Sequence, residues 1–256
     1  MHNHCFMWKT PITLGQRVKR VMTALAATAS QSQAATLLAL LLAVPIMMAH
    51  GAEPAAPPPM AAPSMPPAGN YHLEKSHASL VMRVNHLGFS TYTTRFSRFD
   101  SELTFDPTQI AASKVSTTID ADSFEMDGAP SMCLDIMKGE QMLDTKRFPN
   151  ILFKSEKVRM TGAKSMEITG AFTLHGVTRP MVLKATYNGG YAGIPKMDPQ
   201  ARVGFSAHGQ FKRSDFGIKF GVPAPGTTMG VGDSVDFSIE AEFVGPPLAD
   251  AASGTR

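Results

Sequence analysis

Apolar and polar residues alternate with few breaks along residues 77–105 and 202–220, and this alternation constrains the fold more than any other feature. A period of two places successive side chains on opposite faces of a β-strand, so both segments predict strands with one covered face. In the first segment, one face of the expected strand carries the apolar residues Leu80, Met82 and Val84, and the next position on that face is His86. The pattern therefore predicts an apolar interior that ends at a polar side chain.

The same alternation returns along the rest of the chain, in residues 115–119, 151–155, 168–174, 181–187 and 235–243. We expect about eight to ten strands, each with one apolar and one largely polar face, which is typical of antiparallel sheets. No helices are interleaved between them, so the all-β alternatives are a sandwich and a barrel. Closure into a barrel removes exposed strand edges, and about eight strands leave an interior that is filled by side chains or shared with one ligand.

Residues 129–145 interrupt this pattern with good helix formers. Pro130 suits the first turn of a helix, and Gly139 separates two short helical stretches. Met132, Ile136 and Leu143 are expected on a common side. We expect a helical insertion between strands that either caps one end of the barrel or plugs it.

The first 51 residues predict an exported protein. Basic residues precede an apolar run at 34–49, which is the length of a signal-peptide core and shorter than the roughly 20 residues of a membrane span. Small residues follow, and cleavage is expected just before Ala52. An uncleaved membrane anchor is the alternative, and translation starting at Met22 is a further one.

Composition divides the rest of the chain into three parts. Residues 52–69 contain seven prolines and six alanines and predict an extended linker. The folded domain is expected at 70–245, followed by a disordered tail at 246–256. Without residues 1–51 the chain holds 20 basic and 21 acidic residues, which gives no reason to expect nucleic acid as a partner. Cys133 is then the single cysteine, and we interpret it as a small apolar helix residue.

Four motifs occur in order along the expected domain. They are His77-Ala78-x-Leu80-x-Met82-x-Val84-x-His86-Leu87-Gly88, Arg147-Phe148-Pro149-Asn150-Ile151-Leu152-Phe153, Thr169-Gly170-Ala171-Phe172-Thr173-Leu174-His175-Gly176, and Gly204-Phe205-Ser206-Ala207 leading to Arg213-Ser214-Asp215. Together they resemble the YceI-like polyisoprenoid-binding family. Ala78 and Thr94 depart from the family pattern, which often has serine at the first position and glycine near the second.

The resemblance implies a lipocalin-like antiparallel barrel of eight strands, exported to the bacterial periplasm. It implies a non-enzymatic carrier or sequestering protein that binds a long isoprenoid lipid, such as a quinone or a polyprenyl phosphate. That lipid would be the ligand, with no other cofactor. The membrane would serve only as the source of the lipid, and a homodimer is possible.

Candidate ligand contacts come from the apolar rows, from the helical insertion and from two polar sites. The apolar candidates are Leu80, Met82, Val84, Phe96, Met132, Ile136, Phe153, Phe172, Leu174, Phe205 and Phe237. His86 either bonds a main-chain carbonyl or donates to the lipid head. Arg213 either locks the barrel by pairing with Asp215 or another acid, or meets an anionic head. The small inward residues Gly170, Ala185, Ala207 and Gly209 favour a hollow interior.

Other chemistry finds little support in the sequence. The histidines after residue 51 lack the close spacing of metal ligands, and no glycine-serine elbow or zinc-protease motif occurs. Two alternatives to a carrier stay open. One is a cyclase or isomerase that works around His86 or Asp215, and the other is an interaction module whose barrel is filled.

Overall fold

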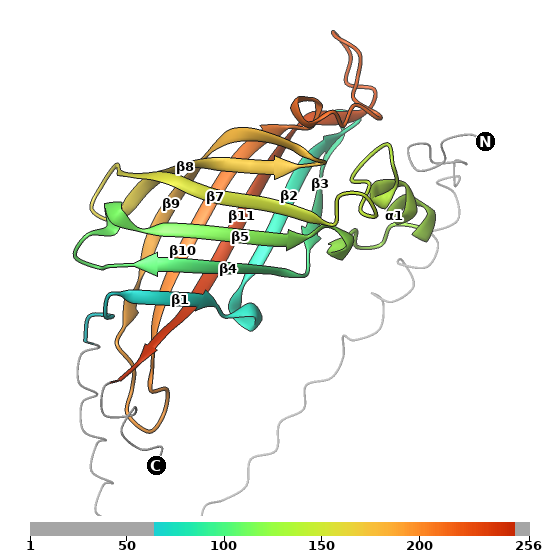
Figure 1. Ribbon diagram of the computed structural model, residues 1–256. Helices are drawn as coiled ribbons and strands as arrows, with labels where there is room; N and C mark the ends of the chain where they lie inside the picture. The colour runs from blue at the N-terminus through green and yellow to red at the C-terminus, as the bar shows by residue number, and fades with distance from the viewer. Residues whose placement is uncertain (1–63, 249–256) are drawn as a thin grey trace, which may run out of the picture. The chain divides into compact units, whose positions relative to one another are not determined.

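The computed structural model of the chain describes residues 64–248, which form a closed eight-stranded antiparallel β-barrel (Figure 1). The ring closes because the first strand pairs with both the second and the last strand of the ring. The strands of the ring, in order, are β1 (Gly69–Leu73), β4 (Phe99–Phe105), β5 (Lys114–Asp120), β7 (Asn150–Met160), β8 (Ser165–Leu174), β9 (Val177–Tyr191), β10 (Gln200–Lys212) and β11 (Val231–Pro247). The predicted fold class is confirmed.

Three further strands extend the sheet from β11, namely β2 (Ser79–His86), β3 (Ser90–Phe96) and β6 (Phe124–Glu125). The long strand β11 changes partner along its length. Val235 lies opposite Val84 of β2, whereas Val244 lies opposite His72 of β1. One strand thus closes the ring at one end and carries the β2–β3 hairpin at the other.

The expected alternation is visible in the burial of the strands. In β9, Met181, Leu183 and Ala185 are buried, while the intervening residues are exposed. The buried side chains form clusters inside the ring, and each cluster combines residues from several strands. The one-sided polarity therefore reflects an interior face and a solvent face, as in other antiparallel sheets.

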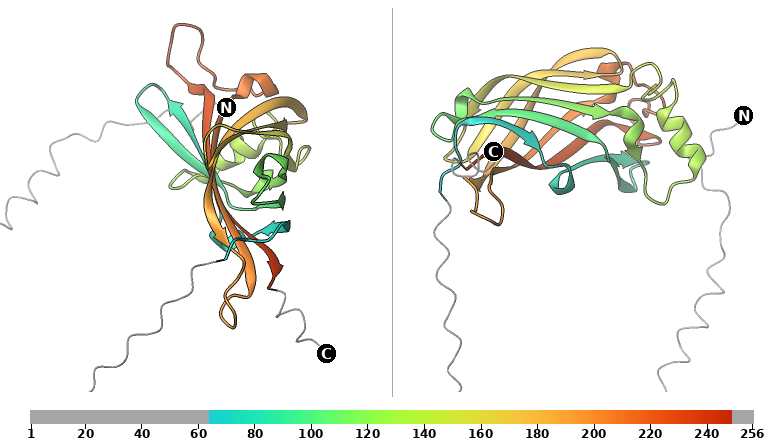
Figure 2. Two further views of the ribbon diagram at one scale, coloured as in Figure 1. Left: turned by 90° about the vertical axis from the view of Figure 1, so that its left-hand side faces the viewer. Right: turned by 60° about the horizontal axis from the view of Figure 1, so that its bottom comes forward.

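The helical insertion is also confirmed. Helix α1 spans Ser131–Lys138, begins after Pro130 and ends at Gly139, and it lies at one end of the barrel (Figures 1 and 2). Short 3-10 turns complete the connections at Lys75–His77, Ile110–Ala112, Ala121–Ser123 and Arg213–Phe216. Within residues 64–248, no helix has the length and apolar composition that a membrane-spanning helix requires.

The barrel begins and ends slightly outside the predicted boundaries. Pro66, which the sequence assigned to the linker, is buried, and the Tyr71 hydroxyl donates to the Pro67 carbonyl at 2.6 Å. At the other end, β11 continues through Pro247, and the Leu248 N–H donates to the Pro199 carbonyl at 2.8 Å. The predicted signal peptide, residues 52–63 and residues 249–256 lie outside the described residues.

Candidate binding cavity

A cavity of about 210 Å³ lies inside the barrel and is bordered by side chains from both large buried clusters. Along β10 and the residue after it, the lining extends from Phe205 to Arg213, which is about 26 Å at ~3.3 Å per residue. Apolar cavities of ~150 Å³ are known to stay dry and to accept a benzene molecule. The interior of this barrel is therefore hollow and elongated rather than fully packed.

Most of the residues proposed from sequence border this cavity. They are Leu80, Met82, Val84, Phe96, Phe153, Phe172, Leu174, Phe205, Arg213 and Phe237. Each apolar member occupies an inward position of its strand, so the alternation that predicted the strands also placed these side chains. Whether they contact a ligand remains a prediction.

Four proposed residues lie outside the lining. Met132 is 46% exposed on α1, and Ile136 packs against the buried cluster without reaching the cavity. The His86 ring, at the end of β2, lies 6.4 Å from the Tyr92 ring. Asp215 is exposed. The two side chains that a cyclase or isomerase would use as bases, His86 and Asp215, are thus not among the residues that line the cavity.

The insertion contributes to the cavity through different residues than those proposed. Met137, Met142 and Leu143 border it, and the last two are buried. The chain after Gly139 turns back toward the barrel, with the Leu143 N–H donating to the Met137 carbonyl at 3.0 Å. The sequence placed Leu143 on the same side as Met132 and Ile136, but neither Met142 nor Leu143 was proposed as a ligand contact, because both follow the helix in an irregular turn.

Hydroxyl groups form most of the polar part of the lining. Thr94, Ser101, Ser113 and Thr117 border the cavity, and the Ser101 and Thr117 hydroxyls lie 2.9 Å apart. Thr94 and Ser101 are buried, and the Ser113 hydroxyl is buried without a hydrogen-bond partner. None of these four residues was proposed as a ligand contact from the sequence. Their hydroxyls can exchange hydrogen bonds with an uncharged polar atom of a ligand.

Arg213 borders the cavity, but its guanidinium group is held by the main chain. Nε donates to the Gly232 carbonyl at 3.0 Å, Nη2 to Val231 at 2.8 Å and Nη1 to Phe220 at 3.1 Å. Burial lowers the pKa of Arg213, and the negative charge of Asp233 opposes this shift. The proposed lock is thus present, with carbonyl groups in place of Asp215, and it fastens the start of β11 to the end of β10.

Two small inward residues have a different role from the one expected. A Cβ atom on Gly170 would lie 2.7 Å from the Phe153 ring, and one on Gly209 would lie 2.5 Å from the Phe237 ring. Both glycines make room for a neighbouring aromatic ring and do not leave open space. Ala185 and Ala207 do border the cavity.

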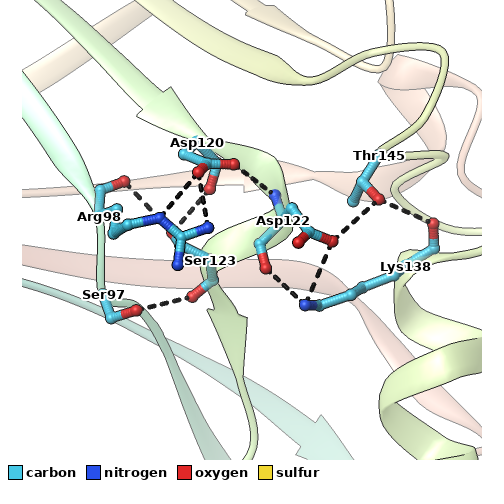
Figure 3. Close-up of polar contacts among 7 residues, drawn as sticks. All are labelled: Ser97, Arg98, Asp120, Asp122, Ser123, Lys138 and Thr145. Atoms are coloured by element: carbon cyan, nitrogen blue, oxygen red, sulfur yellow. Dashed lines mark hydrogen bonds and ion pairs between the residues drawn. The ribbon is translucent and has the colours of Figure 1, made fainter.

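A polar network fastens the helical insertion to the barrel at the end where α1 lies (Figure 3). Nζ of Lys138, at the end of α1, donates to the Asp122 carbonyl and lies 3.3 Å from Asp122 Oδ1. Asp120 holds the turn that carries Asp122. The Asp120 carboxylate accepts two hydrogen bonds from Arg98, at 2.7 and 2.9 Å. The Arg98 guanidinium, together with the Asp122 N–H, holds the pKa of Asp120 below its ordinary value despite partial desolvation.

Within residues 64–248, no group of three or more histidine, cysteine, aspartate and glutamate side chains is placed to hold a metal ion.

The fold and its interior define a closed antiparallel barrel with an elongated, mostly apolar cavity. The chain belongs to the family of YceI-like domains, whose model matches residues 71–243.

Two relatives are about one-third identical to the chain over the aligned residues. A UPF0312 protein of Vibrio cholerae is 34% identical over 169 residues, which cover 66% of this chain and 82% of that protein. A UPF0312 protein of Pseudomonas putida is 35% identical over 177 residues, which cover 68% of this chain and 86% of that protein.

Solved structures share the fold at lower identity. BcnA of Burkholderia cenocepacia superimposes with a TM-score of 0.57 at 21% identity, over 66% of this chain and 98% of that one. A polyisoprenoid-binding domain from Saccharophagus degradans gives a TM-score of 0.50 at 11% identity, over 70% of this chain and 99% of that one.

Proposed function

We propose that this protein binds a long isoprenoid lipid, of the quinone or polyprenyl phosphate type, in its barrel and carries or sequesters it in the periplasm. The observation that carries the proposal is the hollow, mostly apolar interior. Each Å² of apolar surface removed from water contributes about 25 cal/mol, so a lipid tail can bind tightly in such a cavity without hydrogen bonds.

The choice of an isoprenoid rests on two further considerations. The domain from Saccharophagus degradans, which shares this fold, is a polyisoprenoid-binding domain. The elongated lining suits a long chain of repeating apolar units better than a compact ligand. Periplasmic location rests on residues 1–51, whose basic and apolar segments have the order of an export signal.

A full isoprenoid tail needs more room than the cavity of about 210 Å³ offers. Met82, Met137 and Met142 border the cavity, and methionine side chains adapt readily to irregular apolar surfaces. We expect the lining at the α1 end to move outward when the tail enters. Binding should therefore strengthen with each added isoprene unit until the interior is full.

Native mass spectrometry of protein isolated from its own cells tests this proposal directly. We expect a bound species whose mass equals a quinone or a polyprenyl lipid, and protein whose N-terminus begins at or near Ala52. Repeated preparations without any bound lipid, together with no uptake of added isoprenoids, would refute the proposal.

A matched pair of variants tests the location of the ligand. Ala207→Phe places a ring in the cavity, whereas His208→Phe adds the same ring to the exposed face of the same strand. Overfilling a core costs about 1–3 kcal/mol of stability, so each variant is first checked for a cooperative thermal transition. We expect only Ala207→Phe to lose bound lipid. Equal lipid content in the two variants would place the ligand elsewhere.

A further inference from the structure

Two adjoining loops at one end of the barrel present large apolar side chains to solvent. Phe89, in the turn between β2 and β3, is 82% exposed, more than any other large apolar residue described. Met229, in the connection between the Arg213–Phe216 turn and β11, is 68% exposed. Single exposed apolar residues are common, but a pair on adjoining loops marks a candidate contact surface. We call residues 84–94 and 220–232 the tip surface.

The tip surface is held together by hydrogen bonds and close packing. The Leu87 N–H donates to the Gly230 carbonyl at 2.8 Å, and a Cβ atom on Gly88 would lie 2.8 Å from the Thr228 hydroxyl. Leu87 and Gly88 have positive φ angles of 57° and 74°, as in the tight turns of β-hairpins. A leucine in this conformation is uncommon and costs energy, which the Asn85 side chain offsets by accepting from the Gly88 N–H at 2.8 Å. The exposure of Phe89 is therefore built into an ordered turn.

The tip surface contains no lysine, arginine, aspartate or glutamate, although 18% of the chain consists of these residues. It also carries uncharged hydroxyl residues, of which Thr91 and Thr227 are exposed and Tyr92 is partly exposed. Exposed apolar side chains together with uncharged polar ones suit the boundary between lipid tails and head groups, where aromatic and amphipathic side chains are favoured. The residues of the tip surface themselves therefore bring no charged side chain that would have to be desolvated on insertion.

The tip surface is continuous with the binding cavity. Val84 and Val231 stand at the bases of the two loops, and both border the cavity. Both loops lie at the end of the barrel where α1 lies, as the two figures of the whole barrel show (Figures 1 and 2). Arg213 joins this end to the insertion, because its Nη2 donates to Val231 while its Nη1 lies 3.8 Å from the Met142 sulfur atom.

From these observations we infer that the tip surface docks on a lipid bilayer with uncharged or zwitterionic head groups, inserting Phe89 and Met229. Docking places the α1 end of the cavity at the membrane, where the lipid is taken up or delivered. This role in transfer rests on the proposed function, whereas the docking itself stands on the tip surface alone.

Flotation with vesicles of phosphatidylcholine and phosphatidylethanolamine tests the docking. Burying a phenylalanine side chain contributes enough that Phe89→Ser should weaken vesicle binding about tenfold or more, and Met229→Ser somewhat less. Val182→Ser is the matched control, because Val182 is 48% exposed on the outer face of β9. We expect the control to bind like the unchanged protein. Binding should not fall between about 0.15 M and about 1 M salt, since no surface charge is involved.

Several results would overturn the inference. These are no vesicle binding by the unchanged protein, equal loss in Val182→Ser and Phe89→Ser, or binding that high salt abolishes. Sedimentation of the same variants without vesicles tests whether a second copy of the chain, instead of a bilayer, covers the tip surface. If Phe89→Ser converts a dimer to a monomer, a second copy of the chain covers the tip surface and the bilayer does not.

Isoprenoid retention in vesicle-free solution separates this inference from the proposed function. Phe89→Ser should retain isoprenoid as well as the unchanged protein, because its side chain does not border the cavity. Vesicle binding without any isoprenoid retention would refute the carrier proposal and leave docking intact. Isoprenoid retention without vesicle binding would refute docking alone.

Discussion

Nζ of Lys138 lies 3.3 Å from Oδ1 of Asp122, and this ion pair joins the end of α1 to the turn between β5 and β6 (Figure 3). The Lys138 side chain is 26% exposed and the Asp122 side chain 61% exposed, so only the lysine end of the pair is shielded from water. Thr145 adds a longer contact, its hydroxyl lying 3.4 Å from the same carboxylate oxygen. The segment between these residues places Met142 and Leu143 against the cavity, so the ion pair holds one wall of the cavity in position.

Replacing Lys138 with methionine should speed the release of bound lipid. Partly exposed ion pairs contribute about 0.2–1 kcal/mol, which corresponds to a release rate up to about fivefold higher if the segment must move for the lipid to leave. Stopped-flow transfer of a fluorescent isoprenoid to an acceptor measures this rate. Lys184→Met, on the exposed face of β9, is the control. Equal release rates in the two variants would show that the lipid leaves by another route.

Arg213→Met should destabilise the barrel by about 2–4 kcal/mol. The substitution leaves the carbonyl groups of Gly232, Val231 and Phe220 without their donor, and a buried unsatisfied polar group costs about 1–3 kcal/mol. Urea unfolding measures the difference. Arg83→Met is the control, since Arg83 is exposed and donates only to the Ser238 hydroxyl at 3.2 Å. A stable Arg213→Met variant that has lost affinity for phosphate-bearing lipids would instead assign Arg213 to the lipid head.

The sequence was sufficient to predict the strands, the barrel and most of the cavity lining, because alternation determines which side chains are buried and which face of the strand they occupy. It was not sufficient for the polar candidates. His86 continues the apolar row of β2 beyond Met82 and Val84, which border the cavity, but the row reaches the end of the strand at His86 and this residue is not part of the lining. Alternation within one strand shows which face a side chain occupies, but it does not show how far along the strand the cavity extends.

The partner of Arg213 also lay beyond sequence reasoning. Its acceptors are main-chain carbonyls 7, 18 and 19 residues away, and every residue type has such a carbonyl. Likewise, Gly170 and Gly209 were interpreted as open space, because a sequence shows a missing side chain without showing which neighbour fills the gap. Only the register of the adjoining strands reveals the Phe153 and Phe237 rings above them.

Gly170→Ala should destabilise the protein by about 1–3 kcal/mol, because the added methyl group would lie 2.4 Å from the Lys154 carbonyl as well as against Phe153. Gly204→Ala is the control. Its added methyl group would lie 3.7 Å from the nearest side chain, and alanine restricts the unfolded chain more than glycine does. We therefore expect Gly204→Ala to be neutral or slightly stabilising in thermal unfolding. Equal destabilisation by both substitutions would contradict the packing role of Gly170.

Tyr71 should make the barrel sensitive to alkali. Burial raises the pKa of Tyr71 to about 12, and the nearby Tyr187 adds to this shift. The phenol is neutral when protonated, so between about pH 10 and about pH 12 the unfolded chain loses this proton while the folded chain keeps it. Stability therefore falls as pH rises through this window, and the contribution of Tyr71 is fully present below about pH 10.

Comparison with Tyr71→Phe isolates this contribution. The variant lacks the ionisable group, so the stability advantage of the unchanged protein should shrink by about 1–2 kcal/mol between about pH 8 and about pH 11.5. At about pH 8 the variant should be less stable by about 1 kcal/mol, since it also lacks the hydrogen bond to Pro67. Urea unfolding at several pH values measures both differences. A constant difference across this range would mean that the Tyr71 phenol ionises as readily in the folded barrel as in the unfolded chain.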